Sequence, residues 1–253
     1  VLTTDSNGDT GQAPLDVPLD RPVEQDGYQV RYFRCSPFRR YKFSLDLLGW
    51  LYQNAKEFDL AHIHALFSPV SSCAATVARS LHVPYILRPL GTLDPADLQK
   101  KRQLKQIYAT VLEKPNIAGA AAIHFTSLQE AKVSERFGVS TKDLVIPLGV
   151  QLPNTNPQLP VTNSPFPTLL YMSRIDPKKG LNLLLPALEN LLAQGLKFHF
   201  VLAGGNPQDP DYEGKIKAQV QASPLGEYTT IAGFVTGDRK ASLLQQADLF
   251  VLP

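Results

Sequence analysis

The sequence predicts an α/β fold with parallel sheets, organised as a longer first domain and a shorter second one. Short apolar runs alternate with segments of helical periodicity along almost the whole chain, which is typical of βαβ units. The alternation stops at 151–167, a stretch rich in proline and asparagine. At 253 residues, 43% of them apolar, the chain is long enough for roughly two cores.

The predicted strands are short apolar runs bounded by turn residues, and the predicted helices carry apolar residues three and four positions apart. Ser127 and Glu130 fit a capping box at the start of one helix. Residues 9–27 are rich in proline and predict a surface loop. In chain order, strands are predicted at 28–33, 60–64, 85–87, 121–125, 144–146, 168–172, 198–203, 229–232 and 249–252, and helices at 43–57, 70–81, 97–112, 128–137, 180–193, 211–222 and 238–247.

The proline-rich stretch predicts a linker between the two domains. It contains five prolines and three asparagines, carries no charge and shows no periodicity. This composition is typical of a segment that crosses between domains rather than of a packed element. We therefore expect a first domain at 1–150, a linker at 151–167 and a second domain at 168–253.

Composition and charge exclude several classes of function. The formal net charge is +2, so the chain as a whole does not call for nucleic acid or an anionic membrane. Cys35 and Cys73 are too few for a disulfide framework and suit a reducing cytoplasm. No apolar run approaches the roughly 18 residues that a membrane span requires. We expect a cytoplasmic protein that does not bind nucleic acid.

The turn between the strand at 168–172 and the helix at 180–193 carries the strongest functional signal. It holds Arg174, Lys178 and Lys179. A strand that feeds a helix through a short turn places that turn at the carboxyl edge of a parallel sheet, where open α/β folds bind ligands. Two cations beside a helix amino terminus favour a dianionic group. We expect a diphosphate site here; for the pattern alone, a solvated basic turn is the alternative.

This turn, SRIDPKKG, also resembles the G-R-L-x-P-E-K-G segment of retaining glycosyltransferases of family four, the group 1 glycosyltransferases. Further segments fall in that family's order and at its spacing, so the resemblance covers nearly the whole chain apart from residues 9–27 and the linker. These segments are AHIHALFS (61–68), VPYILRPLGTLDP (83–95), HFTSLQEA (124–131), VIPLGV (145–150), FVLAGG (200–205) and AGFVTGDRKASLLQQADLFVLP (232–253).

The resemblance implies the GT-B fold, in which two Rossmann-like domains face a cleft, with an incomplete second domain here. It implies transfer of a hexose from a nucleotide diphosphate sugar to a glycan or lipid-linked acceptor, with retention and without a metal or cofactor. Arg174 and Lys179 would grip the diphosphate and neutralise charge on the leaving group. The family's glycine-rich loop and paired donor-site glutamates would lie before Val1 and beyond Pro253. We therefore expect a chain truncated at both ends and inactive by itself.

Two other functions remain open at this point. A non-catalytic nucleotide-binding or partner protein could be built on the same scaffold. A sugar-nucleotide epimerase would share the architecture and also bind a diphosphate, but it would need acid and base residues facing the sugar, and the sequence shows no convincing pair.

By the same resemblance, two further turns belong to the donor site. Gly204 and Gly205 would let the backbone approach the donor closely, with an ordinary tight turn as the alternative. Phe234 and Val235 match the position where main-chain atoms meet the nucleobase. Main-chain contacts leave no side-chain signature, so the base stays open.

The resemblance places the ends of two first-domain strands on the acceptor side. His64 lies in the first of these segments, and Arg88, Gly91 and Thr92 lie in the second. Many family members have a histidine directly before this glycine, where the chain has Leu90. Leucine can neither donate a hydrogen bond nor take a proton. Arg88 and Thr92 are the nearest polar groups, and we transfer the histidine's role to neither.

The histidines give little support for a metal site. His62 and His64 are two apart on a predicted strand and so point to the same face. A zinc site needs a third and a fourth ligand. The other histidines are scattered and show no matching spacing: His82, His124 and His199.

Two further motifs are better explained by ordinary structure. Asp209-Pro210-Asp211 imitates a D-x-D metal motif, but it precedes a predicted helix, where aspartate serves as a cap. Asn7-Gly8-Asp9-Thr10-Gly11 resembles a phosphate loop, but a proline-rich segment follows it and not the helix that such a loop requires. We expect no metal requirement.

A basic and aromatic strip, RYFRCSPFRRYKF, occupies residues 31–43. It is explained by a surface strip with half-buried aromatics, by a single-stranded nucleic acid site, or by an anionic lipid surface with the helix at 43–57 lying against it. Because the family often uses lipid-linked acceptors, the membrane is the more plausible partner. We therefore expect peripheral membrane contact through 31–58, although an ordinary surface strip explains the segment at least as well.

Overall fold

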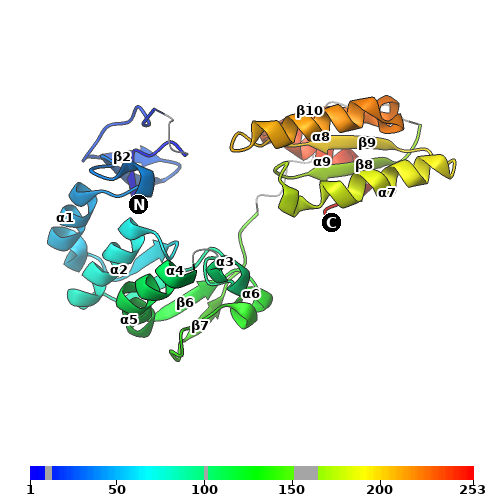
Figure 1. The fold of residues 1–253 in the computed structure, drawn as a ribbon. Helices are drawn as coiled ribbons and strands as arrows, with labels where there is room; N and C mark the ends of the chain where they lie inside the picture. Colours follow the sequence, from blue (N-terminus) through cyan, green and yellow to red (C-terminus); the bar gives the residue numbers. More distant parts are fainter. Residues whose placement is uncertain (9–12, 100–101, 151–164) are drawn as a thin grey trace. The chain divides into compact units, whose positions relative to one another are not determined.

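The computed structural model describes residues 1–8, 13–99, 102–150 and 165–253. The chain divides into two compact units, Val1–Gly149 and Val150–Pro253, and both are drawn in Figure 1. Most of the predicted linker lies outside the described residues.

A small mixed sheet opens unit 1. β1 (Leu2–Thr4) pairs in parallel with β3 (Tyr28–Phe33), and β2 (Pro22–Gln25) pairs with β3 in the antiparallel sense. The surface loop predicted over 9–27 is therefore wrong at 22–25; its residues 9–12 lie outside the described chain. Proline is tolerated in β2 because it is the first residue of an edge strand, where no ladder hydrogen bond is lost.

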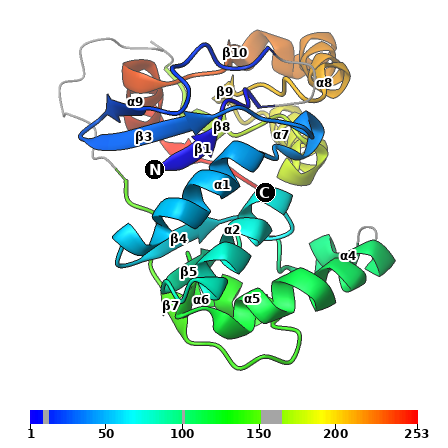
Figure 2. The ribbon, with the colours of Figure 1, turned by 90° about the vertical axis from the view of Figure 1, so that its left-hand side faces the viewer.

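The larger sheet of unit 1 is parallel throughout, in the order β4-β5-β6-β7. Helix α2 (Pro69–Ser80) runs along β4 and β5 (Figure 2), and together with α5 (Lys114–Gly119) it covers one face of the sheet. That face holds the main core of the unit. The strands are β4 (Ala61–His64), β5 (Tyr85–Arg88), β6 (Ala122–Phe125) and β7 (Asp143–Val145), and the core includes Tyr85, Leu87, Ile123 and Phe125.

The helical segment predicted at 97–112 is longer than expected and changes character along its length. After α3 (Pro95–Gln99), α4 (Arg102–Tyr108) passes into a π-helical turn (Ala109–Glu113) and then into α5. Pro115 lies in the first turn of α5, where its missing N–H costs no helical hydrogen bond.

Two other helices of unit 1 are shorter than predicted, α1 (Leu45–Asn54) and α6 (Leu128–Val133). The predicted cap of α6 is confirmed, because the Ser127 hydroxyl accepts the Glu130 N–H at 3.1 Å. The Glu130 carboxylate accepts the N–H of Thr126 at 2.8 Å, one residue before the position that a full capping box uses.

The π-helical turn brings a carboxyl group into the core of unit 1. Glu113 is only 1% exposed, and its Oε1 accepts both the Ser72 hydroxyl and the Phe67 N–H at 2.6 Å. The Tyr108 hydroxyl donates to the same Ser72 oxygen at 2.9 Å. Burial raises the pKa of Glu113 above its usual range, although these two hydrogen bonds act in the opposite direction. The network ties the segment that follows β4 to the π-helical turn.

Unit 2 is a four-stranded parallel sheet in the order β10-β9-β8-β11, with helices on both faces. The strands are β8 (Thr168–Met172), β9 (His199–Ala203), β10 (Thr229–Gly233) and β11 (Leu249–Phe250), and the helices are α7 (Leu181–Ala193), α8 (Pro210–Ala222) and α9 (Gly237–Gln246).

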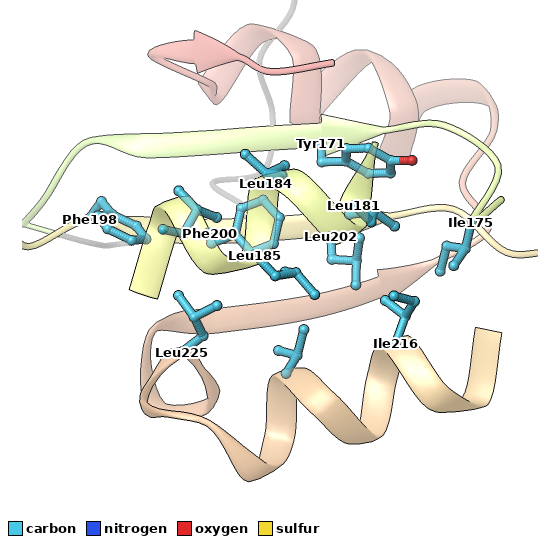
Figure 3. Close-up of a cluster of buried hydrophobic side chains, with 12 residues drawn as sticks. Tyr171, Ile175, Leu181, Leu184, Leu185, Phe198, Phe200, Leu202, Ile216 and Leu225 are labelled. Atoms are coloured by element: carbon cyan, nitrogen blue, oxygen red, sulfur yellow. The ribbon is translucent and has the colours of Figure 1, made fainter. Parts of the chain in front are cut away.

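The helices of unit 2 pack on the sheet through two apolar clusters. Leu185 of α7 and Ile216 of α8 pack with Phe200 on one face (Figure 3). On the other face, Leu243 of α9 packs with Val201. Because both faces are covered, β9 after His199 is a continuous apolar run rather than an alternating one.

Cys35, which is buried, and Cys73, which is half-buried, are both free thiols. Within the described ranges, no helix is both long and apolar enough to cross a bilayer.

We expect Glu113→Gln to change the pH dependence of the stability of unit 1. A carboxyl group with a raised folded pKa contributes stability that is present below its unfolded pKa, about 4.3, and is lost as the pH rises through the folded pKa. The variant should therefore gain stability relative to the original chain as the pH rises from about 4. Urea unfolding followed by the fluorescence of Trp50, the single tryptophan, measures this difference.

Glu113→Ala is the matched control. It leaves the Ser72 hydroxyl and the Phe67 N–H without an acceptor, so it should be about 1–3 kcal/mol less stable than Glu113→Gln at every pH. A difference between Glu113→Gln and the original chain that stays constant with pH would contradict a raised pKa for this carboxyl group.

Candidate functional site

The carboxyl edge of the unit 2 sheet gathers the predicted donor-site residues. Because β8, β9 and β10 are parallel neighbours, the turns that follow them lie at the same edge. The turn after β8 carries Arg174 and Lys179, the turn after β9 carries Gly204 and Gly205, and the turn after β10 carries Phe234 and Val235.

The β8–α7 turn is built around an aspartate and a glycine. Asp176 accepts the Lys178 N–H at 3.0 Å and so caps the short 3-10 turn Pro177–Lys179. Gly180 then opens α7 with a φ of 71°, and no side chain caps the helix there. The amino end of α7 therefore presents backbone N–H groups that attract negative charge.

The Arg174 guanidinium reaches across to the next turn. Its Nη2 lies 3.3 Å from the Asp176 carboxylate, and its Nη1 donates to the Gln208 side chain at 3.0 Å. The side chain is 45% exposed. The guanidinium is therefore held in place at the edge of the sheet, with donors left over for an anion.

Lys179 is half-buried, whereas Lys178 is exposed. In the part of the chain that the structure describes, the Lys179 ammonium has neither a hydrogen bond nor an ion pair. A cation that is partly removed from water and lacks an internal partner is suited to an anionic ligand.

Gly204 brings two turns into direct backbone contact. Its φ is 138°, and a Cβ atom at this position would lie 1.9 Å from the Ser173 carbonyl oxygen. The Ser173 N–H donates to the Ala203 carbonyl at 3.2 Å, and the Gly204 N–H donates to the Gly233 carbonyl at 2.7 Å. The glycine thus serves the packing of the chain on itself, because only glycine fits this close approach. At Gly205 the nearest contact of a Cβ atom would be 3.4 Å.

The two residues predicted in the turn after β10 differ in their exposure to solvent. Phe234 is 80% exposed, whereas Val235 is 8% exposed and packs with Leu243 of α9. The Phe234 ring therefore offers a free aromatic face at the same edge as the cations, and Val235 anchors the turn in the core.

Three side chains that organise this edge were missed in the sequence. Asp176 could have been found from the Asp-Pro pair, which is typical of a capped first turn. Asn206 is 2% exposed and donates its side-chain N–H to the Ile175 carbonyl at 2.9 Å. Gln208 bonds Arg174. Neither Asn206 nor Gln208 has a sequence signal, because each meets its partner through the packing of separate turns.

The acidic pair after β9 caps a helix, as predicted. The Asp209 carboxylate accepts the Tyr212 N–H at 3.0 Å and caps α8. Over the described ranges, no group of three His, Cys, Asp or Glu side chains could hold a metal ion.

The histidines of unit 1 are closer together than their spacing predicted. His124 was expected to be isolated, but its Nδ1 lies 3.2 Å from Nε2 of His62, because β4 and β6 flank the same central strand. His64 and Arg88 are register partners on β4 and β5. The strand pairing, which sequence spacing does not reveal, therefore brings these four side chains together.

The turn after β5 has an unusual backbone. Leu90 and Gly91 both have positive φ, 57° and 77°, and the Leu90 side chain is 50% exposed. The Thr92 hydroxyl donates to the Pro89 carbonyl at 2.7 Å, so its proton is used within the turn. A leucine with positive φ is strained, and such strain is found preferentially at functional sites.

Glu130 of α6 holds this turn in place. Burial alone would raise the pKa of its carboxyl group, but hydrogen bonds from Thr126 and from the Gly91 N–H, with the nearby charge of Arg88, lower the pKa below its usual range. The carboxylate is therefore ionised and accepts hydrogen bonds from donors of its own unit.

The basic strip at 31–43 has a part whose arginines pair within the unit and an outward part. Arg31 pairs with Asp20 at 3.4 Å and lies over the Trp50 ring at 4.9 Å, and Arg34 pairs with Asp5 at 3.6 Å. The outward part consists of exposed side chains, namely Phe38, Arg39, Arg40, Tyr41 and Lys42.

Two family models match the chain. Residues 1–149 match the model described as Glycosyl transferase 4-like domain, and residues 155–253 match the model described as Glycosyl transferases group 1.

The chain is similar to an alpha-D-kanosaminyltransferase of Streptomyces kanamyceticus, at 34% identity over 87 residues, which is 34% of this chain and 22% of the relative. It is also similar to a Salmonella typhimurium protein named as colanic acid biosynthesis glycosyltransferase WcaL, at 27% identity over 85 residues, 34% of this chain and 20% of the relative.

Solved structures share the GT-B fold with this chain. Anabaena HepE in complex with UDP and glucose has a TM-score of 0.59 and 19% identity, over 88% of this chain and 60% of that one. The catalytic domain of starch synthase IV from Arabidopsis thaliana, bound to ADP and acarbose, has a TM-score of 0.54 and 15% identity, over 90% of this chain and 62% of that one. The chain spans less than two thirds of the length of these relatives.

We expect Gly204→Ala to destabilise unit 2 by more than about 2 kcal/mol, because the added Cβ would collide with the Ser173 carbonyl oxygen at a strained φ. Gly205→Ala is the matched control, and it should cost less than about 1 kcal/mol because its nearest contact is an ordinary one. Hydrogen exchange of the β9 amides in increasing urea measures both. Equal effects of the two substitutions would argue against the close backbone contact.

Proposed function

Because the chain belongs to the glycosyltransferases that join a glycosyl transferase 4-like domain to a group 1 domain, we propose that it transfers a hexose from a nucleotide diphosphate sugar to a glycan or lipid-linked acceptor. The observation that carries the proposal is the pair of cations, Arg174 and Lys179, beside the uncapped amino end of α7. A diphosphate is the donor group that this arrangement suits best, because it offers several negatively charged oxygens at short separation.

The two cations would act on the leaving group. As the bond between the anomeric carbon and the diphosphate oxygen breaks, negative charge grows on the diphosphate. Arg174 and Lys179 would stabilise that charge, and donors placed in this way contribute several kcal/mol in enzymes of known mechanism. With fixed cations in this role, the transfer would need neither a metal ion nor a cofactor.

Retention of configuration is part of the proposal. The acceptor hydroxyl would attack the anomeric carbon from the face that the diphosphate leaves, and a diphosphate oxygen would take the hydroxyl proton. One carbon–oxygen bond forms and one breaks, so no protein nucleophile is required. By holding the diphosphate still, Arg174 and Lys179 would also position the oxygen that accepts the proton.

The rest of the edge would hold the nucleoside. The main chain at Phe234 and Val235 would meet the base, and the exposed Phe234 ring would give it an aromatic surface for stacking. Because Gly204 and Gly205 have no side chain, the backbone of the turn after β9 would let the donor approach closely. His64, Arg88, Gly91 and Thr92 would lie on the acceptor side.

We expect Arg174→Ala and Lys179→Ala each to weaken the binding of a nucleoside diphosphate by about tenfold or more, the scale of one charge-assisted hydrogen bond. Separate calorimetric titrations with UDP, GDP, ADP and the hexose conjugate of each measure the affinity. The nucleotide that binds most tightly identifies the preferred base. Lys178→Ala is the matched control, since it removes the same charge from the same turn at an exposed position, and it should change the affinity less than about twofold.

Three outcomes of this titration are informative. Equal losses in Lys178→Ala and Lys179→Ala would mean that the turn acts only through its overall charge, and would remove the basis of the proposal. Binding without transfer by a longer natural chain would favour the non-catalytic alternative. Because Arg174 also contacts Asp176 and Gln208, thermal unfolding of each variant separates loss of the ligand contact from loss of the fold.

The outward part of the basic strip is the surface that we propose for peripheral contact with anionic lipid. The double variant Arg39→Glu and Arg40→Glu should reduce co-sedimentation with phosphatidylglycerol vesicles by about tenfold or more, because each basic residue near such a surface contributes about 1 kcal/mol. The control reverses two exposed charges of unit 2, Lys215→Glu and Lys240→Glu. Equal effects of the two double variants, or equal binding to phosphatidylcholine, would exclude a specific membrane surface.

A further inference from the structure

One face of the β4–β7 sheet carries an unusual set of side chains. Alternate residues of a strand point to opposite faces, and the core under α2 and α5 takes Ile63, Leu87 and Ile123. The opposite face therefore receives His62 and His64 from β4, Arg88 from β5 and His124 from β6. His64 and Arg88 are the last residues of their strands, and so they lie at the edge where parallel sheets bind ligands.

Two of the histidines satisfy each other. His124 is 8% exposed, and its Nε2 lies 2.9 Å from the Ile146 carbonyl oxygen, which can only accept. In the neutral ring, Nδ1 of His124 must then be the acceptor, and Nε2 of His62 donates to it at 3.2 Å. The pair is ordered without an outside partner.

The remaining two groups are not satisfied in this way. Nε of Arg88 is buried and has no hydrogen-bond partner, and over the described residues the His64 imidazole makes a ring contact with His62 at 4.5 Å but no hydrogen bond. His64 and Arg88 stand side by side on paired strands. A buried guanidinium nitrogen without an acceptor is costly, so this face has donors that call for an acceptor from outside.

The face combines Arg88 and the histidines with one carboxylate beside them. The acidic group that faces Arg88 is Glu130 of α6, and its carboxylate is already occupied by Thr126 and Gly91. Burial, together with the charges of Arg88 and His124, lowers the pKa of His64. Burial and the charges of His64, His124 and Arg88 lower that of His62. Positive charge on the neighbouring groups thus disfavours protonation of His62 and His64. A bound anion would relieve that repulsion.

We propose that Arg88 and His64, supported by the His62–His124 pair, form a binding site for a phosphate group. Arg88 supplies a planar fork suited to two phosphate oxygens, and His64 supplies one further donor that becomes a cation when protonated. That the phosphate belongs to the sugar acceptor rests on the function proposed above. The site would make a phosphorylated acceptor, such as a sugar phosphate or a lipid-linked sugar phosphate, the substrate of this chain.

The site can be tested with an inorganic dianion on the whole chain. Sulfate stays a dianion over the pH range of histidine titration, so its affinity reports the protein groups alone. Side-chain nitrogen NMR should show saturable shifts of His62, His64 and His124 on adding sodium sulfate, but not on adding sodium chloride at equal ionic strength. His82 and His199 lie outside the site and serve as internal references. Binding should tighten as the pH falls, because a dianion favours protonated His64.

Variants assign the site to its residues. Arg88→Gln should weaken sulfate binding by about tenfold or more, and His64→Gln should remove most of its pH dependence. Arg21→Gln, which removes the same charge from an exposed position of unit 1, should leave binding unchanged. If Arg88→Gln disturbs the fold, as seen in the Trp50 fluorescence, Arg88→Lys takes its place; it keeps the charge, loses the fork and should bind with intermediate affinity.

The outcomes separate this site from the donor site. Shifts of the three histidines that persist in Arg88→Gln, or that chloride reproduces, would overturn the inference even if nucleoside diphosphates bind unit 2. Histidine shifts in a chain that binds no nucleoside diphosphate would leave the anion site standing without the proposed transfer. A soluble hexose 1-phosphate and a polyprenyl monophosphate in detergent micelles, titrated separately, distinguish a soluble acceptor from a lipid-linked one. Failure of both to shift the histidines would remove the assignment to an acceptor.

Discussion

The parallel pairing of β9 with both β8 and β10 is the constraint on which the proposed donor site depends. Each strand must return through a helix to the same starting edge, so every strand ends at the opposite edge and its following turn lies there. The turns are then locked by backbone contacts, of which the approach of Gly204 to Ser173 is the closest. The backbone positions of Arg174 and Lys179 are thus set by main-chain packing, and the Arg174 side chain is held further by Asp176 and Gln208.

The same constraint acts differently in unit 1. There the polar groups lie on the strands themselves, so the spacing of the sheet fixes the distances between them. One face is apolar and covered by α2 and α5, and the other gathers Arg88 with three histidines. Glu113 ties the segment after β4 to the π-helical turn, so a buried carboxyl group supports the edge at which His64 stands. The proposed phosphate site is therefore built on rigid elements rather than on a loop.

Most strands could be predicted, because a strand that is covered on both faces must be apolar along its length, as β9 is after His199. The errors have physical causes. β2 was missed because its stability comes from pairing with β3 and not from its own composition. The helix predicted at 97–112 was too short, because the helical segment continues through Pro115, and a proline is tolerated in the first turn of α5. His124 was treated as isolated because sequence spacing carries no information on which strands are neighbours.

The sequence by itself determined the class of fold, the family and the candidate cations, because strand and helix periods, turn residues and motif order are local properties of the chain. Only the tertiary structure decided which of these residues meet. It showed that Gly204 is needed for a backbone contact, that Phe234 is free whereas Val235 is buried, and that His62 reaches His124 across β5. These facts depend on contacts between residues far apart in the chain, and such contacts form only when the sheet is assembled.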